Sequence, residues 1–383
     1  MSRFRFVSFL LAAGLSAGHA ATACAGVLDR IHLPAGFSVD YFSHSVPDAR
    51  SLALGEYGTV FVGTRKAGKV YALTDRNGDG IADHRYIIAR GLNMPNGVAF
   101  YQGALYVAEN QRIIRFPDIE ARLGNPPRPE VIFDALPTKR HHGWRYLAAG
   151  PDGRLYVSIG APCNICDEGL PFATIHRLRP DGSDFEVYAA GVRNSVGLTW
   201  HPDSGAMWFT DNGRDWMGDN LPPDELNRAA SKGLHFGYPY RHGKGISDPE
   251  FGTKTPEQTF TPPALELGAH VAALGLRFYT GPMFPASFKN RLFIAEHGSW
   301  NRSTPVGYRI VAAQVEDGKV SGHEVFASGW LYGGRKWGRP VDVLVMPDGA
   351  LLVSDDVHGA VYRISYRVGK TSAGGESDAN PGN

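Results

Sequence analysis

Residues 147–162 read LAAGPDGRLYVSIGAP, in which a short apolar stretch, a turn and a second apolar stretch run out into polar residues. The Asp and Gly at its centre suit a tight hairpin turn. The β-branched and aromatic residues that follow are typical of a strand. Related phrases begin at Gly58, Asn96 and Gly197 and lie within 275–300 and 341–364, so the phrase occurs six times along the chain.

The copies follow one another at intervals of about 50 residues, the period of a four-stranded propeller blade. We therefore predict an all-β fold, a six-bladed β-propeller with four-stranded antiparallel blades over residues 27–367. A β-helix has shorter repeats, and a pair of β-sandwiches would not give one phrase six times. We expect one helical turn at 118–125, and loops over one face in the longer interval between the fourth and fifth copies.

The composition fits a turn-rich globular protein. The chain has 383 residues, of which 43% are hydrophobic, and it holds 47 glycines and 26 prolines. Its net charge is +1 with no basic stripe, which argues against nucleic acid as a partner.

The N-terminus predicts export. Arg3 and Arg5 precede the apolar stretch FVSFLLAAGLSA and then small residues, so we expect a cleaved signal peptide over residues 1–23. A lipoprotein anchor at Cys24 is disfavoured because the usual leucine of a lipobox is absent. The mature protein is predicted to be periplasmic or secreted, without stable membrane insertion and with a flexible tail over 368–383.

Two cysteines remain, Cys163 and Cys166. In an oxidising compartment a disulfide is expected. A zinc site would need a second pair of ligands, and a redox CxxC usually opens a helix in a βαβ unit. Neither context is visible in the sequence.

Polar residues follow the repeated strands, as in AEN, IGAP, TDNG, AEHG and SDD. Equivalent strand ends of a propeller meet at one end of its channel, so these residues predict a ligand site there. Taken singly, each is also compatible with a solvated turn.

Three segments carry side chains suited to chemistry. In RHHGWR (140–145), Arg140 and Arg145 would disfavour an imidazolium and keep the histidines neutral, as a base requires. In GVRNSVGL, Arg193 and Asn194 precede a strand, and an arginine can hold a carboxylate or a developing oxyanion. The oxygen-rich segment 211–227 suits calcium. A hydrogen-bonded loop histidine, a surface salt bridge and a solvated loop are the simpler readings.

A second calcium-like loop is DRNGDGIAD, with oxygens at Asp75, Asn77, Asp79 and Asp83. It matches the first part of an EF-hand loop but has Tyr86 in place of the twelfth-position glutamate. A plain turn is the alternative.

The order of HHGWR, GVRNSVGL, DNG…PPDELN, FGYPY, GLRFYTG, LFIAEHGSWNRS and GRPVDV…PDG…LLVSDD resembles the soluble PQQ-dependent glucose/sorbosone (aldose sugar) dehydrogenase family, most closely its sorbosone branch. The resemblance covers about residues 30–366. It implies that the catalytic base is His141, with His142 as its neighbour. It also places Arg193 and Asn194 over the cofactor, and backbone carbonyls of Gly213 and Arg214 on a calcium ion.

The resemblance further implies that Arg302 and Arg339 hold carboxylates of PQQ, and that Asn93 is a polar substrate contact. Two residues after Arg339, where the family has another arginine, this chain has Val341. One carboxylate contact is therefore expected to be missing or to be supplied elsewhere, for which Lys336 and Arg335 are the candidates.

By this resemblance the protein would oxidise an aldose or a sorbosone-like keto-aldehyde with PQQ and Ca²⁺. His141 would take the hydroxyl proton as hydride moves to the quinone, and Arg193 would stabilise the oxygen. A cytochrome or quinone would then accept the electrons. Two other functions stay open: a calcium-dependent lactonase or other hydrolase using Glu109, Asn110, Asn212 and Asp355, and a non-catalytic binding propeller.

Overall fold

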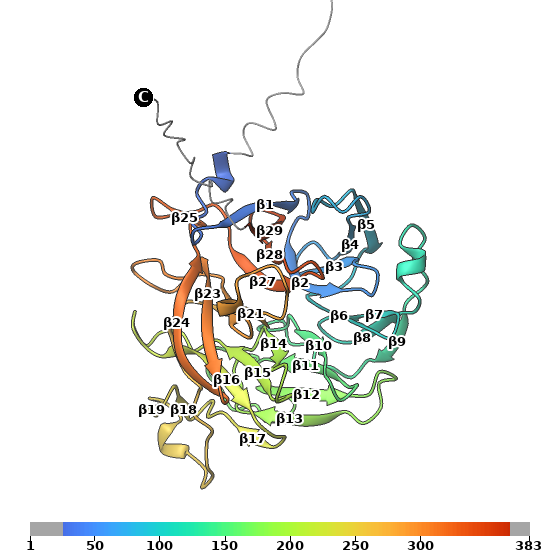
Figure 1. The fold of residues 1–383 in the computed structure, drawn as a ribbon. Helices are drawn as coiled ribbons and strands as arrows, with labels where there is room; N and C mark the ends of the chain where they lie inside the picture. The colour runs from blue at the N-terminus through green and yellow to red at the C-terminus, as the bar shows by residue number, and fades with distance from the viewer. Residues whose placement is uncertain (1–25, 368–383) are drawn as a thin grey trace, which may run out of the picture.

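The computed structural model describes residues 26–367 and shows six β-sheets arranged around a common centre (Figure 1). The predicted signal peptide (1–23), Cys24 and the predicted tail (368–383) lie outside the described residues. The blades are, in order along the chain, β2 (Ala49–Leu54) to β5 (His84–Ala89), β6 (Gly97–Tyr101) to β9 (Glu130–Phe133), β10 (Leu147–Ala149) to β13 (Glu186–Ala190), β14 (Leu198–Trp200) to β16 (Pro223–Ala229) with β20 (Leu265–Ala269), β21 (Ala273–Phe278) to β24 (Lys319–Ala327), and β27 (Pro340–Val345) to β29 (Ala360–Tyr366) with β1 (Phe37–Ser43). The intervening strands are β3 (Val60–Thr64), β4 (Val70–Thr74), β7 (Ala104–Ala108), β8 (Ile113–Phe116), β11 (Leu155–Ile159), β12 (Thr174–Leu178), β15 (Met207–Asp211), β22 (Leu292–Glu296), β23 (Arg309–Glu316) and β28 (Leu351–Asp355). The predicted six-bladed propeller is therefore confirmed.

The last blade closes the ring, because its outer strand comes from the beginning of the chain. Strand β1 pairs antiparallel with β29, from Phe37 opposite Tyr366 to Ser43 opposite Val361. In Figure 1 the blue β1 lies beside the red β29. One blade thus contains strands from both ends of the chain, which holds the ring closed.

One apolar cluster fills each of the six interfaces between neighbouring blades. The second strand of each blade serves two of them. In β15, Met207 and Phe209 pack toward the third blade, whereas Trp208 packs toward the fifth. This explains why the repeated strand is apolar on both faces: side chains alternate across a strand, and here both sides are buried.

The long interval between the fourth and fifth repeats contributes to both the channel and the rim of the ring. Its first part, after β15, borders the channel. Its second part adds β17 (Leu234–His235) parallel to β13 and forms the hairpin β18 (Arg241–His242) and β19 (Ile246–Ser247), which lies at the rim of the ring in Figure 1. Another small hairpin, β25 (Leu331–Tyr332) with β26 (Arg335–Lys336), precedes the last blade.

Helix is scarce, as expected. The part described includes the 3₁₀ turns Glu120–Arg122, Gly252–Lys254 and Ala286–Phe288, the first within the predicted helical turn. None of the described helices has the length and apolarity that a membrane span requires.

Candidate functional site

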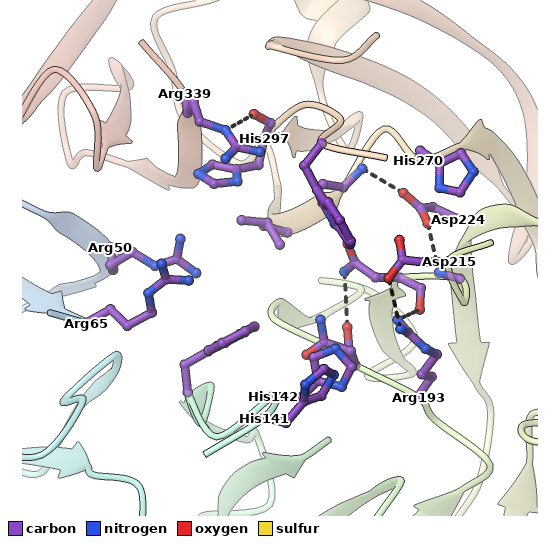
Figure 2. Close-up of a pocket in the computed structure, with 17 residues that line it drawn as sticks. Arg50, Arg65, His141, His142, Arg193, Asp215, Asp224, His270, His297 and Arg339 are labelled. Atoms are coloured by element: carbon purple, nitrogen blue, oxygen red, sulfur yellow. Dashed lines mark hydrogen bonds and ion pairs between the residues drawn. The ribbon is translucent and has the colours of Figure 1, made fainter. Parts of the chain in front are cut away.

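A cavity of about 330 Å³ opens at one end of the ring (Figure 2). Most of its lining residues have charged or polar side chains; the set is Arg50, Arg65, His141, His142, Trp144, Arg193, Asn194, Asn212, Gly213, Asp215, Asp224, His270, Ala272, Leu274, His297, Trp300 and Arg339. The structure thus brings His141, Arg193 and Arg339 together in one place, although they come from three blades.

The lining residues have a common origin in the repeat. Arg65, Asn212 and His297 directly follow the second strands β3, β15 and β22, and Arg339 directly precedes β27. First strands and second strands are neighbours in a hairpin, so the start of one and the end of the other lie at the same end of the blade. The predicted convergence of polar strand ends is confirmed for these blades.

The two histidines differ in environment. His142 is buried, and its Nδ1–H donates to the carbonyl of Ala161 at 2.8 Å, which leaves Nε2 as the unprotonated nitrogen. The ring of His141 packs edge-on against it with 4.1 Å between ring centres, and His141 is exposed to the cavity. The sequence therefore placed both rings correctly but not their division into a buried and an accessible one.

Both imidazoles are kept neutral, though not by the residues we expected. Burial and then the Arg193 guanidinium lower the pKa of His141 and hold the pKa of His142 well below its usual value. The flanking arginines are engaged elsewhere: Arg140 donates to Asn93 Oδ1, and Arg145 is buried with its guanidinium on the carbonyls of Asn110, His142 and Pro137. The charge that acts on the histidines comes from another blade.

Arg193 is buried, and all three nitrogens of its guanidinium group donate hydrogen bonds. Its Nε and Nη2 donate to the main-chain oxygen and Oδ1 of Asn164, both at 2.8 Å, and Nη1 donates to the carbonyl of Asn212 at 3.0 Å. Asp215 lies 3.5 Å from Nη2. The backbone amides of Arg193 and Asn194 donate to Asp211, which anchors the pair predicted from GVRNSVGL at the cavity wall.

Two further arginines were missed by the sequence analysis. Arg50 and Arg65 come from the first blade and point into the cavity opposite Arg193 (Figure 2). Burial and the neighbouring Arg50 lower the pKa of Arg65. The available signal was the segment GTRK, which ends the second strand of the first repeat where four of the other five copies have acidic or amide residues.

His297 and Asp356 form a buried pair beside them. The Nε2–H of His297 donates to Asp356 Oδ1 at 2.9 Å, and Arg50 Nη1 lies 2.9 Å from Asp356 Oδ2. Burial lowers the pKa of His297 to about 4, so the ring is neutral while the His297 and Arg50 contacts keep Asp356 ionised despite its burial. Asp356 therefore compensates Arg50.

Arg339 and Arg65 are the cavity arginines without an ion-pair contact, although the charge of Asp356 acts favourably on both. Arg339 donates to the carbonyls of His297 and Gly298, and its guanidinium lies over the Tyr308 ring. Arg65 lies over the ring of Trp144, with 4.9 Å to its centre. Within residues 26–367, neither Arg65 nor Arg339 forms an ion pair with a carboxylate.

The expected substitutes for the missing arginine lie elsewhere. Val341 is buried in the apolar cluster between the third and fourth blades, with Tyr146, Val196 and Leu274. Arg335 and Lys336 form the exposed strand β26 and do not line the cavity. Arg50 and Arg65 occupy the cavity wall instead.

Two other predicted cofactor and substrate contacts also lie outside the cavity wall. Arg302 borders a separate hollow and donates to the Asp219 carbonyl and Asn220 Oδ1. Asn93 is engaged with Gln111 and Arg140.

The predicted calcium segment is partly at the cavity. Gly213 lines it, and the Gly213 amide donates to Asp224 Oδ1 while Ala272 donates to Oδ2. Burial raises the pKa of Asp224 to about 6. The Arg214 side chain turns away to pair with Asp248 and Glu250 of the inserted hairpin region.

The calcium-like loop at 75–83 is an ordinary turn in its contacts. Asp75, Asn77, Asp79 and Asp83 all accept from backbone amides of the same loop. Among the described residues no group of three His, Cys, Asp or Glu side chains is arranged to hold a metal ion.

The residues named for a hydrolase are not gathered. Glu109 pairs with Arg112, Asn110 holds the carbonyls of Lys139 and Gly143, and Asp355 accepts from backbone amides and Tyr362. Only Asn212 of that set appears in the cavity wall described.

The predicted disulfide is confirmed, since Cys163 and Cys166 are bonded. Its loop follows β11 and is packed against the cavity wall through Asn164.

Comparison with known proteins places this arrangement in a family. Residues 27–365 match the model of a domain of unknown function, DUF7133. The chain belongs to the DUF7133 family. An uncharacterized protein of Borreliella burgdorferi is 33% identical over 355 residues, which cover 89% of this chain and 92% of the relative.

Solved structures share the fold of this DUF7133 member at low identity. The holo PQQ domain of pyranose dehydrogenase from Coprinopsis cinerea has a TM-score of 0.72 at 19% identity, covering 88% of this chain and 97% of that chain. A calcium structure of a family AA12 enzyme from Trichoderma reesei has a TM-score of 0.74 at 20% identity, with the same coverage. The PQQ-bound aldose sugar dehydrogenase of Streptomyces coelicolor has a TM-score of 0.63 at 18% identity, covering 88% of this chain and all of that chain.

The cavity suits a polyanion. It contains four guanidinium groups, and two of them have no carboxylate partner in the described part of the chain. A partly buried cation without an ion-pair partner is costly, and an anionic ligand would reduce that cost. For a metal, the backbone oxygens near Gly213 are hard donors of the kind calcium prefers, and a ligand's own oxygens would have to complete the shell.

Proposed function

We propose that this DUF7133 protein is a quinoprotein oxidoreductase that holds PQQ in the central cavity and oxidises a sugar, either an aldose or a sorbosone-like keto-aldehyde. The observation that carries the proposal is the pair of guanidiniums without an ion-pair contact, Arg65 and Arg339, in one cavity with neutral histidines. PQQ bears three carboxylates, and when bound it supplies a quinone that accepts a hydride. The shared fold with PQQ-bound sugar dehydrogenases supports the same function.

The arginines would bind and orient the cofactor. Arg65 and Arg339 lie on the cavity wall without an ion-pair contact. Arg50 lies beside Arg65 and forms an ion pair with Asp356. Guanidinium groups bind carboxylates through paired, charge-assisted hydrogen bonds. Calcium, if bound, would lie against the backbone oxygens near Gly213.

His141 is the proposed base. It is the accessible histidine of the pair, and its lowered pKa leaves a ring nitrogen free to take the proton of a sugar hydroxyl at neutral pH. Arg193, held rigidly by Asn164 and Asn212, would stabilise the negative charge that develops on the same oxygen. Trp300 lies at the cavity with 67% of its surface exposed and offers an apolar face to the sugar ring.

The electrons must leave to an external acceptor, for which we propose a cytochrome or quinone. We further propose that the protein is exported, since its disulfide would persist outside the cytoplasm.

The test is reconstitution. Purified apoprotein would be titrated with PQQ by calorimetry, with and without Ca²⁺, and then assayed for dye reduction with a panel of aldoses, pyranoses and keto-aldehydes. We expect saturable binding, calcium-dependent dye reduction and loss of activity with a chelator. Lactone hydrolysis without PQQ would instead support the hydrolase, and ligand binding without turnover would support a binding propeller.

A further inference from the structure

The loop closed by the disulfide carries the residue that fixes Arg193. Asn164 lies between Cys163 and Cys166 and accepts two of the three hydrogen bonds that the Arg193 side chain donates, each at 2.8 Å. The other is accepted by Asn212. One residue of the third blade therefore determines the orientation of a guanidinium that belongs to the fourth.

Asn164 also holds the neighbouring cavity segment. Its Oδ1 accepts from the Asp215 amide at 2.8 Å, and its Nδ2 donates to the Asp215 carbonyl at 3.1 Å. Asp215 in turn lies 3.5 Å from Arg193. The side-chain amide of Asn164 is thus shared between the guanidinium and the segment that follows Gly213.

The disulfide fixes this loop together with hydrogen bonds to its neighbours. Residues 161–169 contain no regular secondary structure. The Cys166 amide donates to Tyr238 Oη of the inserted segment at 3.0 Å, and Tyr240 Oη donates to Asp167 Oδ2 at 2.6 Å. A covalent link across three residues restricts the loop strongly, and a site holds its geometry only when the groups behind it are fixed. Both cysteines are only partly buried, so small reductants can reach them.

We propose that Asn164 is a positioning residue for Arg193 and that the Cys163–Cys166 disulfide makes this positioning possible, so that reduction weakens the site without unfolding the propeller. Reduction by dithiothreitol transfers two electrons and two protons to the disulfide and gives two thiols and the cyclic oxidised reagent. The kinetic part of the proposal rests on the proposed function, whereas the structural part does not.

The structural part is tested by hydrogen–deuterium exchange on the apoprotein. In the reduced protein and in a Cys163→Ser/Cys166→Ser variant we expect faster exchange at 162–167, at 193–194 and at 211–216. Peptides of the first blade should be unchanged, and so should the melting temperature to within a few degrees. Faster exchange confined to 162–167 would overturn the coupling to Arg193.

The kinetic part is tested on protein that is reduced as the apoprotein, freed of dithiothreitol and then loaded with PQQ, because the dithiol would also reduce the quinone. Asn164→Ala removes one of the two bonds to Arg193, and reduction loosens both, so kcat should fall by about tenfold in the variant and further on reduction, with KM changed less. After reduction, wild type and Asn164→Ala should have the same kcat. The exposed Glu168→Gln, in the same loop, is the control and should behave as wild type.

Two results would contradict the proposal: a reduced Asn164→Ala protein that stays less active than reduced wild type, or a kcat that does not respond to reduction. If wild type shows no PQQ-dependent activity at all, the proposed function fails, and the exchange measurement still decides whether the loop positions Arg193.

Discussion

His141 and Arg193 line one cavity from different blades, and burial together with the Arg193 guanidinium lowers the pKa of the His141 imidazole. The neutral ring is the form that can accept a proton. The rate of sugar oxidation should therefore fall on the acid side only as the pH drops through this lowered value, below the usual histidine pKa of about 6.5. A kcat profile from pH 4 to 9 would measure this limb.

The same relationship predicts how the limb moves. Arg193→Gln removes a positive charge that opposes the imidazolium, so the acid limb should shift to higher pH while kcat falls. A limb that stays in place in the variant would show that another group titrates.

Replacing His141 tests the base itself. His141→Ala should lower kcat by a factor of about 10² to 10⁴, the usual contribution of general-base catalysis, and leave the affinity for PQQ close to wild type. His323→Ala, on the exposed strand β24, is the matched control and should be neutral. Full activity in His141→Ala would move the role to His142 or His297.

The cationic wall predicts which arginines matter for affinity. Arg65→Gln and Arg339→Gln should each weaken PQQ binding by about 10- to 100-fold, since a hydrogen bond to a charged group contributes about 1.5–3 kcal/mol. Arg302→Gln removes an arginine outside the cavity and should bind normally. Calorimetric titration of the three variants compares them directly, and a loss confined to Arg302→Gln would reverse the assignment.

Ring closure predicts a stability effect far from the cavity. Phe37 in β1 packs against Phe284, Phe288, Phe326 and Tyr366. Phe37→Ala should lower the free energy of unfolding by about 3 kcal/mol, the low end for a large aromatic residue because Phe37 is only partly buried. Chemical denaturation would measure it, with the exposed Tyr57→Ala as control.

The fold could be predicted from the sequence because the second strand has the same packing role in every blade. The second strand must fill two interfaces at once, so Phe209 and Trp208 have counterparts in each repeat and the phrase becomes visible six times. A local pattern of this kind can be recognised in the sequence even when the tertiary contacts are unknown.

The site was less predictable, because its members come from separate blades. His141, Arg193 and Arg339 were found through motifs that carry family resemblance. Arg65 was missed because its role arises only when the first blade closes against the others. Arg302 was misplaced for the opposite reason: its neighbourhood resembled a cofactor contact, but the loop around Asp219 captures its guanidinium.

Because β1 pairs with β29, the ring can close only after the last strand of the chain has been synthesised. During synthesis on the ribosome, β1 stays unpaired until β29 emerges. The ion pair of Arg50 also forms late, because its partner Asp356 follows β28. A chain cut short before that point would leave an open ring with an unfinished wall, so premature products should be degraded rather than accumulate as partially active species.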